Sequence, residues 1–97
     1  MADYILSERA KKDLLDIGEN TEGKWSEEQA ERYVRMILAA CKALVASPLS
    51  GRSYEPERPG LWGKSCGRHV IFYRILSDNR VRIVRVLHER MDFLRHL

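Results

Sequence analysis

The sequence predicts a single α+β domain, in which an antiparallel pair of helices packs on one face of a mainly antiparallel four-stranded sheet. Three observations support this fold class. Two segments in the first half repeat apolar residues at helical spacing, three runs in the second half are rich in β-branched and aromatic residues, and a short apolar run stands near the start. A chain of 97 residues is long enough for one hydrophobic core, so residues 1–97 are expected to form one domain.

Residues 4–6 predict a short strand, and the segment after them predicts the first helix. Ser7 is a good N-cap residue, because its hydroxyl can accept a hydrogen bond from an unpaired backbone N–H of the first turn. The apolar stripe that follows has the i, i+4, i+7 spacing of a helix face and consists of Ala10, Leu14 and Ile17. Gly18 and residues 20–23 offer stop signals, and the pattern also allows the helix to continue past Gly18.

Residues 26–46 are the most clearly predicted element, a second helix. Ser26 and Gln29 have the spacing of a capping box, in which each side chain satisfies a backbone N–H of the other residue. Pro48 ends the helix, because proline has no N–H and disfavours a helical residue before it. The short loop before this helix predicts an antiparallel hairpin. The apolar face consists of Ala30, Tyr33, Val34, Ile37, Leu38, Cys41, Leu44 and Val45.

The second half of the chain predicts three antiparallel strands after an irregular connection. Residues 48–61 hold all three prolines and are expected to form that connection. Residues 62–66, 69–76 and 81–87 are rich in β-branched and aromatic side chains, which favour strands. Residues 78–79 are Asp and Asn, which suit the positive φ angles of a two-residue turn between the last two strands.

Such a turn also predicts the register of the last two strands. The expected cross-strand pairs are Leu76–Val81, Arg74–Ile83, Phe72–Arg85 and Val70–Leu87. The helices are expected to cover the opposite face, whose apolar set is Ile71, Tyr73, Ile75, Val84 and Val86. The face that carries these cross-strand pairs is also largely apolar, so the tail of the chain or a partner must cover it as well. The candidates are a partner protein, the C-terminal tail, or both, and the apolar residues of the tail are Met91, Phe93, Leu94 and Leu97.

Charge is divided unevenly along the chain. Residues 1–50 hold 7 basic and 9 acidic side chains, whereas residues 51–97 hold 10 and 5, so the net charges are −2 and +5. The basic half is expected to meet a negatively charged partner, and an acidic protein segment would serve as well as nucleic acid. The predicted helix at residues 26–46 begins with acidic residues, so sequence-specific nucleic-acid binding is not expected.

The sequence offers no sign of a membrane segment or a cofactor. No run approaches about 18 apolar residues, and the start lacks the pattern of a signal peptide, so a cytoplasmic protein without a membrane partner is expected. Cys41 and Cys66 lack the CxxC spacing of metal or redox sites and are expected to be reduced thiols. His69 faces His88 in the predicted hairpin, but no third ligand is placed by spacing, so neither a metal nor another cofactor is expected.

The order of elements resembles the RelE/ParE superfamily of bacterial toxins, and its ParE branch is the closer match. The most specific likeness is the tail, His88 with residues 90–92, beside the strand Phe72-Tyr73-Arg74. Ser26 departs from the glycine that the family often shows there, and the capping box accounts for the change. The other residues that carry the likeness are Tyr4, Leu6, Ser7, Ala10, Asp13, Leu14, Ile17, Trp25, Gln29, Ala30, Tyr33, Pro48, Gly51, Arg52, Val70, Ile71, residues 84–87, His96 and Leu97.

The resemblance to ParE implies the toxin of a type II toxin–antitoxin pair, which binds and poisons DNA gyrase and is neutralised by a ParD-like antitoxin. It implies an inhibitor that is not itself an enzyme, so no catalytic residue is assigned. An antitoxin segment is expected to place apolar anchors and carboxylates on the sheet face away from the helices. The alternative for Phe72 is a core position beneath the C-terminal tail. The candidate antitoxin contacts are Val70, Phe72, Arg74, Ile83 and Arg85.

Toxicity is assigned to the end of the last strand, where charge is dense. The candidate residues are His88, Glu89, Arg90, Met91 and Asp92. An alternative role for Arg90 and Asp92 is to pin the C-terminus to the sheet.

The rival function is that of a RelE-like toxin, which cleaves mRNA on the ribosome. The tail of this chain has no tyrosine, and Val70 stands where the ribonuclease members align an arginine. Proton transfer and charge stabilisation for cleavage therefore lack obvious residues, with only His88 and Arg90 remaining.

Overall fold

The computed structural model describes residues 4–20 and 26–97. The predicted stop signals at residues 21–23 and the family residue Trp25 lie outside the described residues. None of the described helices is long and apolar enough to cross a membrane. The elements in chain order are β1 (Tyr4–Leu6), α1 (Glu8–Asn20), α2 (Glu27–Ala46), the 3₁₀ helix η1 (Pro48–Ser50), β2 (Arg52–Ser53), β3 (Trp62–Cys66), β4 (His69–Ile75), β5 (Val81–His88) and α3 (Phe93–His96).

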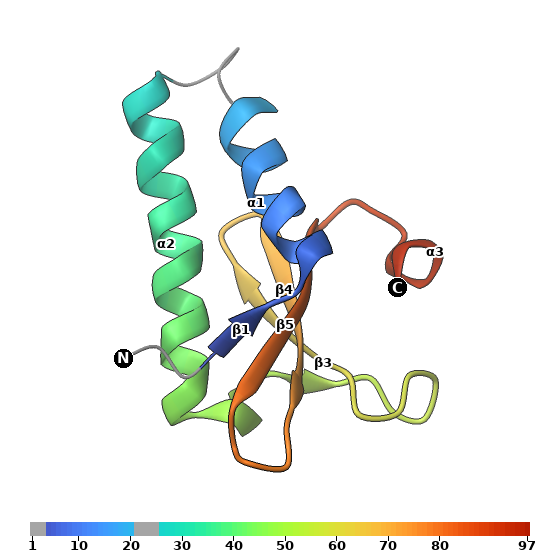
Figure 1. Ribbon diagram of the computed structural model, residues 1–97. Helices are drawn as coiled ribbons and strands as arrows, with labels where there is room; N and C mark the ends of the chain where they lie inside the picture. Colours follow the sequence, from blue (N-terminus) through green and yellow to red (C-terminus); the bar gives the residue numbers. More distant parts are fainter. Residues whose placement is uncertain (1–3, 21–25) are drawn as a thin grey trace.

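The strands form one mixed sheet in the order β1-β5-β4-β3-β2. β1 runs parallel to β5, and the other neighbouring pairs are antiparallel. Figure 1 shows α1 and α2 running in opposite directions on one side of the sheet, with the short α3 on the other side. The predicted α+β fold with a helix hairpin and a mainly antiparallel sheet is confirmed, and the two-residue β2 adds a fifth strand to the four expected.

Both long helices begin at the predicted caps. The hydroxyl of Ser7 accepts the N–H of Ala10 at 3.0 Å and donates to the carbonyl of Val84 at 2.8 Å, which joins the start of α1 to β5. The capping box of α2 is complete, with both bonds between Ser26 and Gln29 at 3.1 Å. The last helical residue is Ala46, two residues before Pro48, as predicted.

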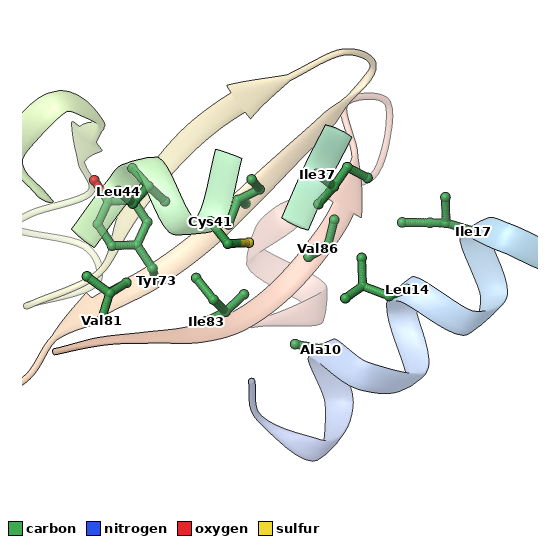
Figure 2. Packing of buried hydrophobic residues seen from close by; sticks show 11 residues of the cluster. Ala10, Leu14, Ile17, Ile37, Cys41, Leu44, Tyr73, Val81, Ile83 and Val86 are labelled. Atoms are coloured by element: carbon green, nitrogen blue, oxygen red, sulfur yellow. The ribbon is translucent and has the colours of Figure 1, made fainter. Parts of the chain in front are cut away.

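The main core lies between the two helices and the sheet. Figure 2 shows side chains of α1 and α2 meeting those of β4 and β5 in one cluster. Tyr73 is fully buried there, and its hydroxyl donates to the carbonyl of Pro48 at 2.6 Å, which fastens η1 to the sheet. The buried members of this cluster are Ala10, Leu14, Ile17, Ile37, Cys41, Leu44, Ile71, Tyr73, Val81, Ile83 and Val86.

The turn between β4 and β5 differs from the predicted two-residue turn. The N–H of Leu76 bonds to the carbonyl of Arg80 at 2.8 Å, so the loop has three residues, 77–79. Asn79 takes a positive φ of 66°, as the last residue of a three-residue loop does. Ile75 therefore pairs with Val81, one step from the predicted register, and the pairs Leu76–Val81 and Arg74–Ile83 are wrong.

A β-bulge at Val84 restores the predicted register along the rest of the hairpin. Tyr73 pairs with Ile83 and Phe72 pairs with Arg85, so Val84 is the extra residue on β5. The predicted pairs Phe72–Arg85 and Val70–Leu87 are confirmed. Because side chains alternate along a strand, the one-residue offset places Val81 and Ile83 in the core under the helices and Val84 on the opposite face.

We call the sheet face away from α1 and α2 the outer face. Its own hydrophobic cluster consists of the buried Leu61, Val70, Phe72 and Leu87, with Tyr54, Val84, Phe93 and Leu97 packed against them. Phe93 and Leu97 of the C-terminal tail are two of the side chains that cover this face. The tail was one of the two covers that the sequence predicted, and this prediction is confirmed. The prediction that Ile83 lies on the outer face is wrong, because the offset in register buries it completely on the helix side.

Candidate functional site

The 88–92 segment, His88 to Asp92, follows β5 and forms a tight turn before α3. The N–H of Met91 bonds to the carbonyl of His88 at 2.9 Å, and the N–H of Arg90 bonds to His88 Nδ1 at 3.1 Å. The N–H of Glu89 donates to the carbonyl of Arg68 at 2.9 Å, which ties the segment to the turn between β3 and β4. The backbone of the segment is therefore held both by His88 and by a neighbouring turn.

The side chains after His88 in this segment are all exposed. Glu89 forms a surface ion pair with Arg68 at 3.7 Å. Within residues 4–20 and 26–97, the side chains of Arg90 and Asp92 form no ion pair or hydrogen bond. The five predicted toxicity residues thus share one turn, and two of their charged side chains have no partner among the described residues.

Arg85 and Asp13 form the main polar contact between α1 and the sheet. Arg85 Nε and Nη2 donate to the two carboxylate oxygens of Asp13 at 2.8 and 2.9 Å, and the N–H of Val86 donates to the same carboxylate at 2.9 Å. The two side chains are only 11% and 12% exposed. The hydrogen bonds that Arg85 donates to Asp13 raise the pKa of Arg85, and burial opposes this rise.

Arg85 also pins the C-terminal tail, because its Nη1 donates to the carbonyl of His96 at 2.9 Å. The sequence analysis gave this as an alternative role of Arg90 and Asp92, but in the structure Arg85 is the residue that bonds to the tail. The prediction of Arg85 as a surface contact for an antitoxin carboxylate does not fit this geometry, since Asp13 already occupies the guanidinium. The ion pair with Asp13 neutralises the charge of Arg85 within the chain, where the sequence analysis expected a carboxylate of the antitoxin.

A cleft of about 470 Å³ lies beside the 88–92 segment, between α1, the end of β5 and α3. Asp13, His69, Met91 and His96 are among the residues that line it, together with His88. In the part of the chain that the structure describes, no three His, Cys, Asp or Glu side chains converge closely enough to hold a metal ion. The ionisable side chains that line the cleft are its three imidazoles, Asp16, and the ion pair between Asp13 and Arg85.

Tyr33, His69 and His88 form an array from α2 to the end of β5. The hydroxyl of Tyr33 lies 2.7 Å from His69 Nδ1 and accepts the N–H of Arg68 at 3.0 Å. His69 pairs directly with His88, as predicted, and their rings meet edge to face with centroids 5.2 Å apart. Burial and, to a smaller extent, the neighbouring His88 lower the pKa of His69, so its ring is neutral at neutral pH.

Most of the predicted antitoxin contacts are not exposed in this structure. Val70 and Phe72 lie on the outer face but are buried, and the ring of Phe93 meets that of Phe72 at 4.8 Å between centroids. The alternative that places Phe72 in a core beneath the tail therefore describes the structure. Of the five candidates, only Arg74 is exposed, and its Nη1 donates to the carbonyl of Pro59 at 2.8 Å.

The sequence analysis missed the roles of Asp13 and Tyr33. Asp13 stands at the i+3 position of the apolar stripe that begins at Ala10, and an acidic residue there signals a buried partner. Tyr33 was placed on an apolar face and among the residues of the family likeness, with no hydrogen-bond partner predicted, although a buried tyrosine hydroxyl usually finds one. Their partners, Arg85 and His69, lie far away in the sequence, so no local sequence pattern identifies them.

A solved structure, the chromosomal ParDE TA system from P. aeruginosa, contains a chain with the same fold. The two chains share 23% sequence identity, and the TM-score is 0.77 over 91% of this chain and 96% of that chain. At this identity the likeness concerns the fold. The arrangement of helices and strands over most of this chain therefore also occurs in a solved structure.

Curated relatives match the sequence over nearly its full length. Toxin ParE1 of Mycobacterium tuberculosis is 39% identical over 94 residues, which cover 97% of this chain and 96% of the relative. Toxin ParE1 of Caulobacter vibrioides is 41% identical over 97 residues, which cover 100% and 99%. Toxin ParE of Escherichia coli is 29% identical over 97 residues, which cover 100% and 94%.

The family resemblance drawn from the sequence is confirmed by a family model. The model of the ParE toxin of the type II toxin–antitoxin system parDE matches residues 4–93. The match includes α1 and α2, every strand and the whole 88–92 segment. Together with relatives that are 39% and 41% identical, this match shows that the chain belongs to the ParE toxin family of type II toxin–antitoxin systems.

Proposed function

We propose that this toxin inhibits growth by binding and poisoning DNA gyrase in the cytoplasm, and that a ParD-like antitoxin neutralises it. The observation that carries the proposal is the 88–92 segment. Its backbone is held by hydrogen bonds, while the side chains of Arg90 and Asp92 have no partner within the described residues. A turn that is already ordered loses little conformational entropy on binding, and its charged groups can form strong hydrogen bonds to a protein surface.

An mRNA ribonuclease of the RelE type is the second candidate, and the surroundings of Val70 and Arg85 argue against it. Cleavage needs a general base and cations that stabilise charge on the phosphate. Val70 is an apolar residue of the outer-face cluster, and Arg85 is already paired with Asp13. His88 and Arg90 are the remaining candidates, and His88 Nδ1 is engaged by a backbone N–H.

A DNA supercoiling assay with purified gyrase tests the proposed target. We expect the toxin to inhibit supercoiling or to accumulate cleaved DNA, and Arg90→Ala to reduce this effect. Because the Arg90 side chain forms no bond within the described residues, its loss should change the free energy of unfolding by less than about 0.5 kcal/mol. Thermal unfolding of the variant would then show that any lost inhibition does not come from lost stability.

Arg82→Ala is the matched control for this assay. Arg82 is an exposed arginine of β5, the strand that leads into the 88–92 segment, and it lies near the β4–β5 turn, far along the strand from His88. Equal inhibition by both variants and the wild type would refute the role of the 88–92 segment. A wild-type protein without effect on gyrase would refute the target itself, and ribosome-dependent mRNA cleavage would be the next assay.

The antitoxin proposal centres on Arg74, the exposed member of the predicted contact set. An acidic segment of the antitoxin binds there, because the guanidinium lies on the basic half of the chain and keeps donors beyond its bond to Pro59. We expect Arg74→Ala to weaken antitoxin binding by about 10-fold in calorimetry, as the loss of one charge-assisted bond does. Arg95→Ala removes the same charge from the exposed surface of α3, and equal losses in both variants would exclude a specific contact at Arg74.

A further inference from the structure

The sheet carries a second cleft at its β2 edge, away from the residues used by the proposed function. Among the strands that the structure describes, β2 pairs with only Trp62 and Gly63 of β3, so β3 is itself the edge strand from Lys64 onward. This edge cleft has a volume of about 380 Å³. The residues that line it are Ser50, Gly51, Arg52, Gly63, Lys64 and Ser65.

Two glycines allow β2 to lie close to β3 at this edge. The N–H of Gly51 donates to the Tyr73 hydroxyl at 3.2 Å, and a Cβ at Gly51 would lie 2.5 Å from the same oxygen. A Cβ at Gly63, which stands opposite Arg52, would lie 2.7 Å from a ring carbon of Tyr54. Both positions therefore contribute only backbone atoms to the lining of the edge cleft.

The polar side chains of the edge cleft come from both faces of the sheet. Arg52 and Ser65 lie on the outer face, in the two register rows that contain buried residues of the outer-face cluster. Lys64 occupies the alternate position on β3 and lies on the helix side. The edge cleft is thus bounded by one cation on each side of the sheet, with a hydroxyl beside them.

Both cations are positioned by contacts that leave most of their donors unused. The guanidinium carbon of Arg52 lies 5.2 Å from the centroid of the Tyr54 ring, a contact that orients the group without using its N–H donors. Lys64 Nζ donates to the carbonyl of Ser50 at 3.3 Å, and an ammonium group has three donors. The N–H groups of Arg52 and two donors of Lys64 are therefore available to a ligand.

The positive charge of the edge cleft is not balanced by an acidic side chain. Within residues 4–20 and 26–97, neither Arg52 nor Lys64 forms an ion pair, and no Asp or Glu is among the lining residues. The cleft beside the 88–92 segment differs, because Asp13 and Asp16 line it. Two cations at a sheet edge, where backbone N–H groups are also open, form a concave surface that favours an anion.

We propose that the edge cleft binds a phosphate group, with Arg52, Lys64 and Ser65 as its side-chain donors. Phosphate oxygens accept several charge-assisted hydrogen bonds, and guanidinium, ammonium and hydroxyl groups are their common donors in proteins. The phosphate belongs to a small phosphate compound or to the backbone of a nucleic acid, since both present the same oxygens. No histidine or carboxylate stands among the lining residues, so the edge cleft provides no general base for cleavage.

An NMR titration of the purified toxin with inorganic phosphate tests the site without gyrase or antitoxin. We expect the backbone amides of residues 50–53 and 63–65 to shift and to saturate with phosphate, and not with sodium chloride at the same ionic strength. Arg52→Ala and Lys64→Ala should each weaken phosphate binding by about 10-fold, the usual effect of one charge-assisted hydrogen bond. Unfolding midpoints would show that both variants are folded, and Lys64→Gln replaces Lys64→Ala if the latter is not.

Arg9→Ala is the matched control for the loss of charge. Arg9 is an exposed arginine of α1, the helix that follows β1 at the opposite edge of the sheet, so this variant should bind phosphate like the wild type. Shifts that do not saturate, that chloride reproduces, or that are equal in Arg52→Ala, Lys64→Ala and Arg9→Ala would overturn the proposal.

A short DNA duplex of arbitrary sequence then identifies the source of the phosphate. Binding that weakens with salt, and whose salt dependence falls by about one counterion in Arg52→Ala and in Lys64→Ala, would assign the site to a nucleic-acid backbone. Saturable binding of inorganic phosphate without binding of the duplex would assign it to a small phosphate compound. Either result supports the phosphate site whether or not the toxin inhibits gyrase.

Discussion

Replacing Asp13 with alanine removes the contact that joins α1, β5 and the C-terminal tail. Its carboxylate accepts three hydrogen bonds, two from Arg85 and one from the N–H of Val86. The variant leaves the guanidinium, in a side chain only 11% exposed, with the carbonyl of His96 as its remaining partner. Removing one partner of a buried ion pair costs about 3–5 kcal/mol. That is a large part of the roughly 5–15 kcal/mol by which a domain of this size is stable.

Thermal and urea unfolding followed by circular dichroism measure this loss. We expect the midpoint to fall by roughly 12 °C or more, since 1 kcal/mol shifts the midpoint of such a domain by about 4–8 °C. Asp16→Ala is the matched control on the same helix. Asp16 pairs with Lys12 at 3.4 Å on the surface, where the two side chains are 47% and 75% exposed, so its loss should cost less than about 1 kcal/mol.

A loss in Asp13→Ala no larger than that of the control would refute the reasoning, because it would show that solvent screens the Arg85 pair. Asp13→Asn separates charge from shape. An amide oxygen at the Oδ2 position still accepts the N–H groups of Arg85 Nε and Val86, but the NH₂ group then faces Arg85 Nη2 and cannot accept from it. We therefore expect its stability to lie between those of the wild type and Asp13→Ala.

Three further predictions concern the outer-face cluster, the capping box and the thiols. Phe72→Ala should cost about 3–5 kcal/mol in urea unfolding, because Phe72 is fully buried against Phe93, and an unchanged midpoint would contradict a core beneath the tail. Ser26→Ala should cost about 1 kcal/mol by removing the side-chain bond to Gln29, and a loss below about 0.3 kcal/mol would show that the cap contributes little. Burial raises the pKa of Cys41 to about 12, so at pH 8 only about one thiol in 10⁴ is a thiolate. Alkylation of native Cys41 should therefore be slow at pH 8 and faster at pH 10, whereas rapid labelling at pH 8 in the native state would refute this burial.

Elements with local signals were predicted well. The caps at Ser7 and Ser26 and the end of α2 before Pro48 stand where the sequence places them, because each depends on residues within one turn of the helix end. The three strand runs were also found within about one residue of their bounds, since their composition and alternation are local.

The register of β4 and β5 was predicted only in part. The pairs from Phe72 onward are right, because the three-residue loop and the bulge at Val84 shift the register in opposite directions and cancel. Near the turn, the remaining offset moved Ile83 from the outer face into the main core. Burial of Val81 and Ile83 under the helices offsets the free-energy cost of the longer turn and the bulge. The sequence of the hairpin alone does not show that the helices will bury these two residues.

The sequence by itself determined the α+β class, the helix hairpin, the strands, the ParE family and the position of the 88–92 segment in the chain. Only the tertiary structure decided how charged and polar side chains are used. Asp13 and Arg85 are 72 residues apart, and Tyr33 and His69 are 36 apart, yet each pair is in hydrogen-bond contact. Such contacts arise when two elements pack on the same sheet, and their energy depends on the burial that this association creates. The sequence can mark a residue as charged, but the fold decides whether that charge is paired internally, as in Arg85, or presented to a partner, as proposed for Arg90.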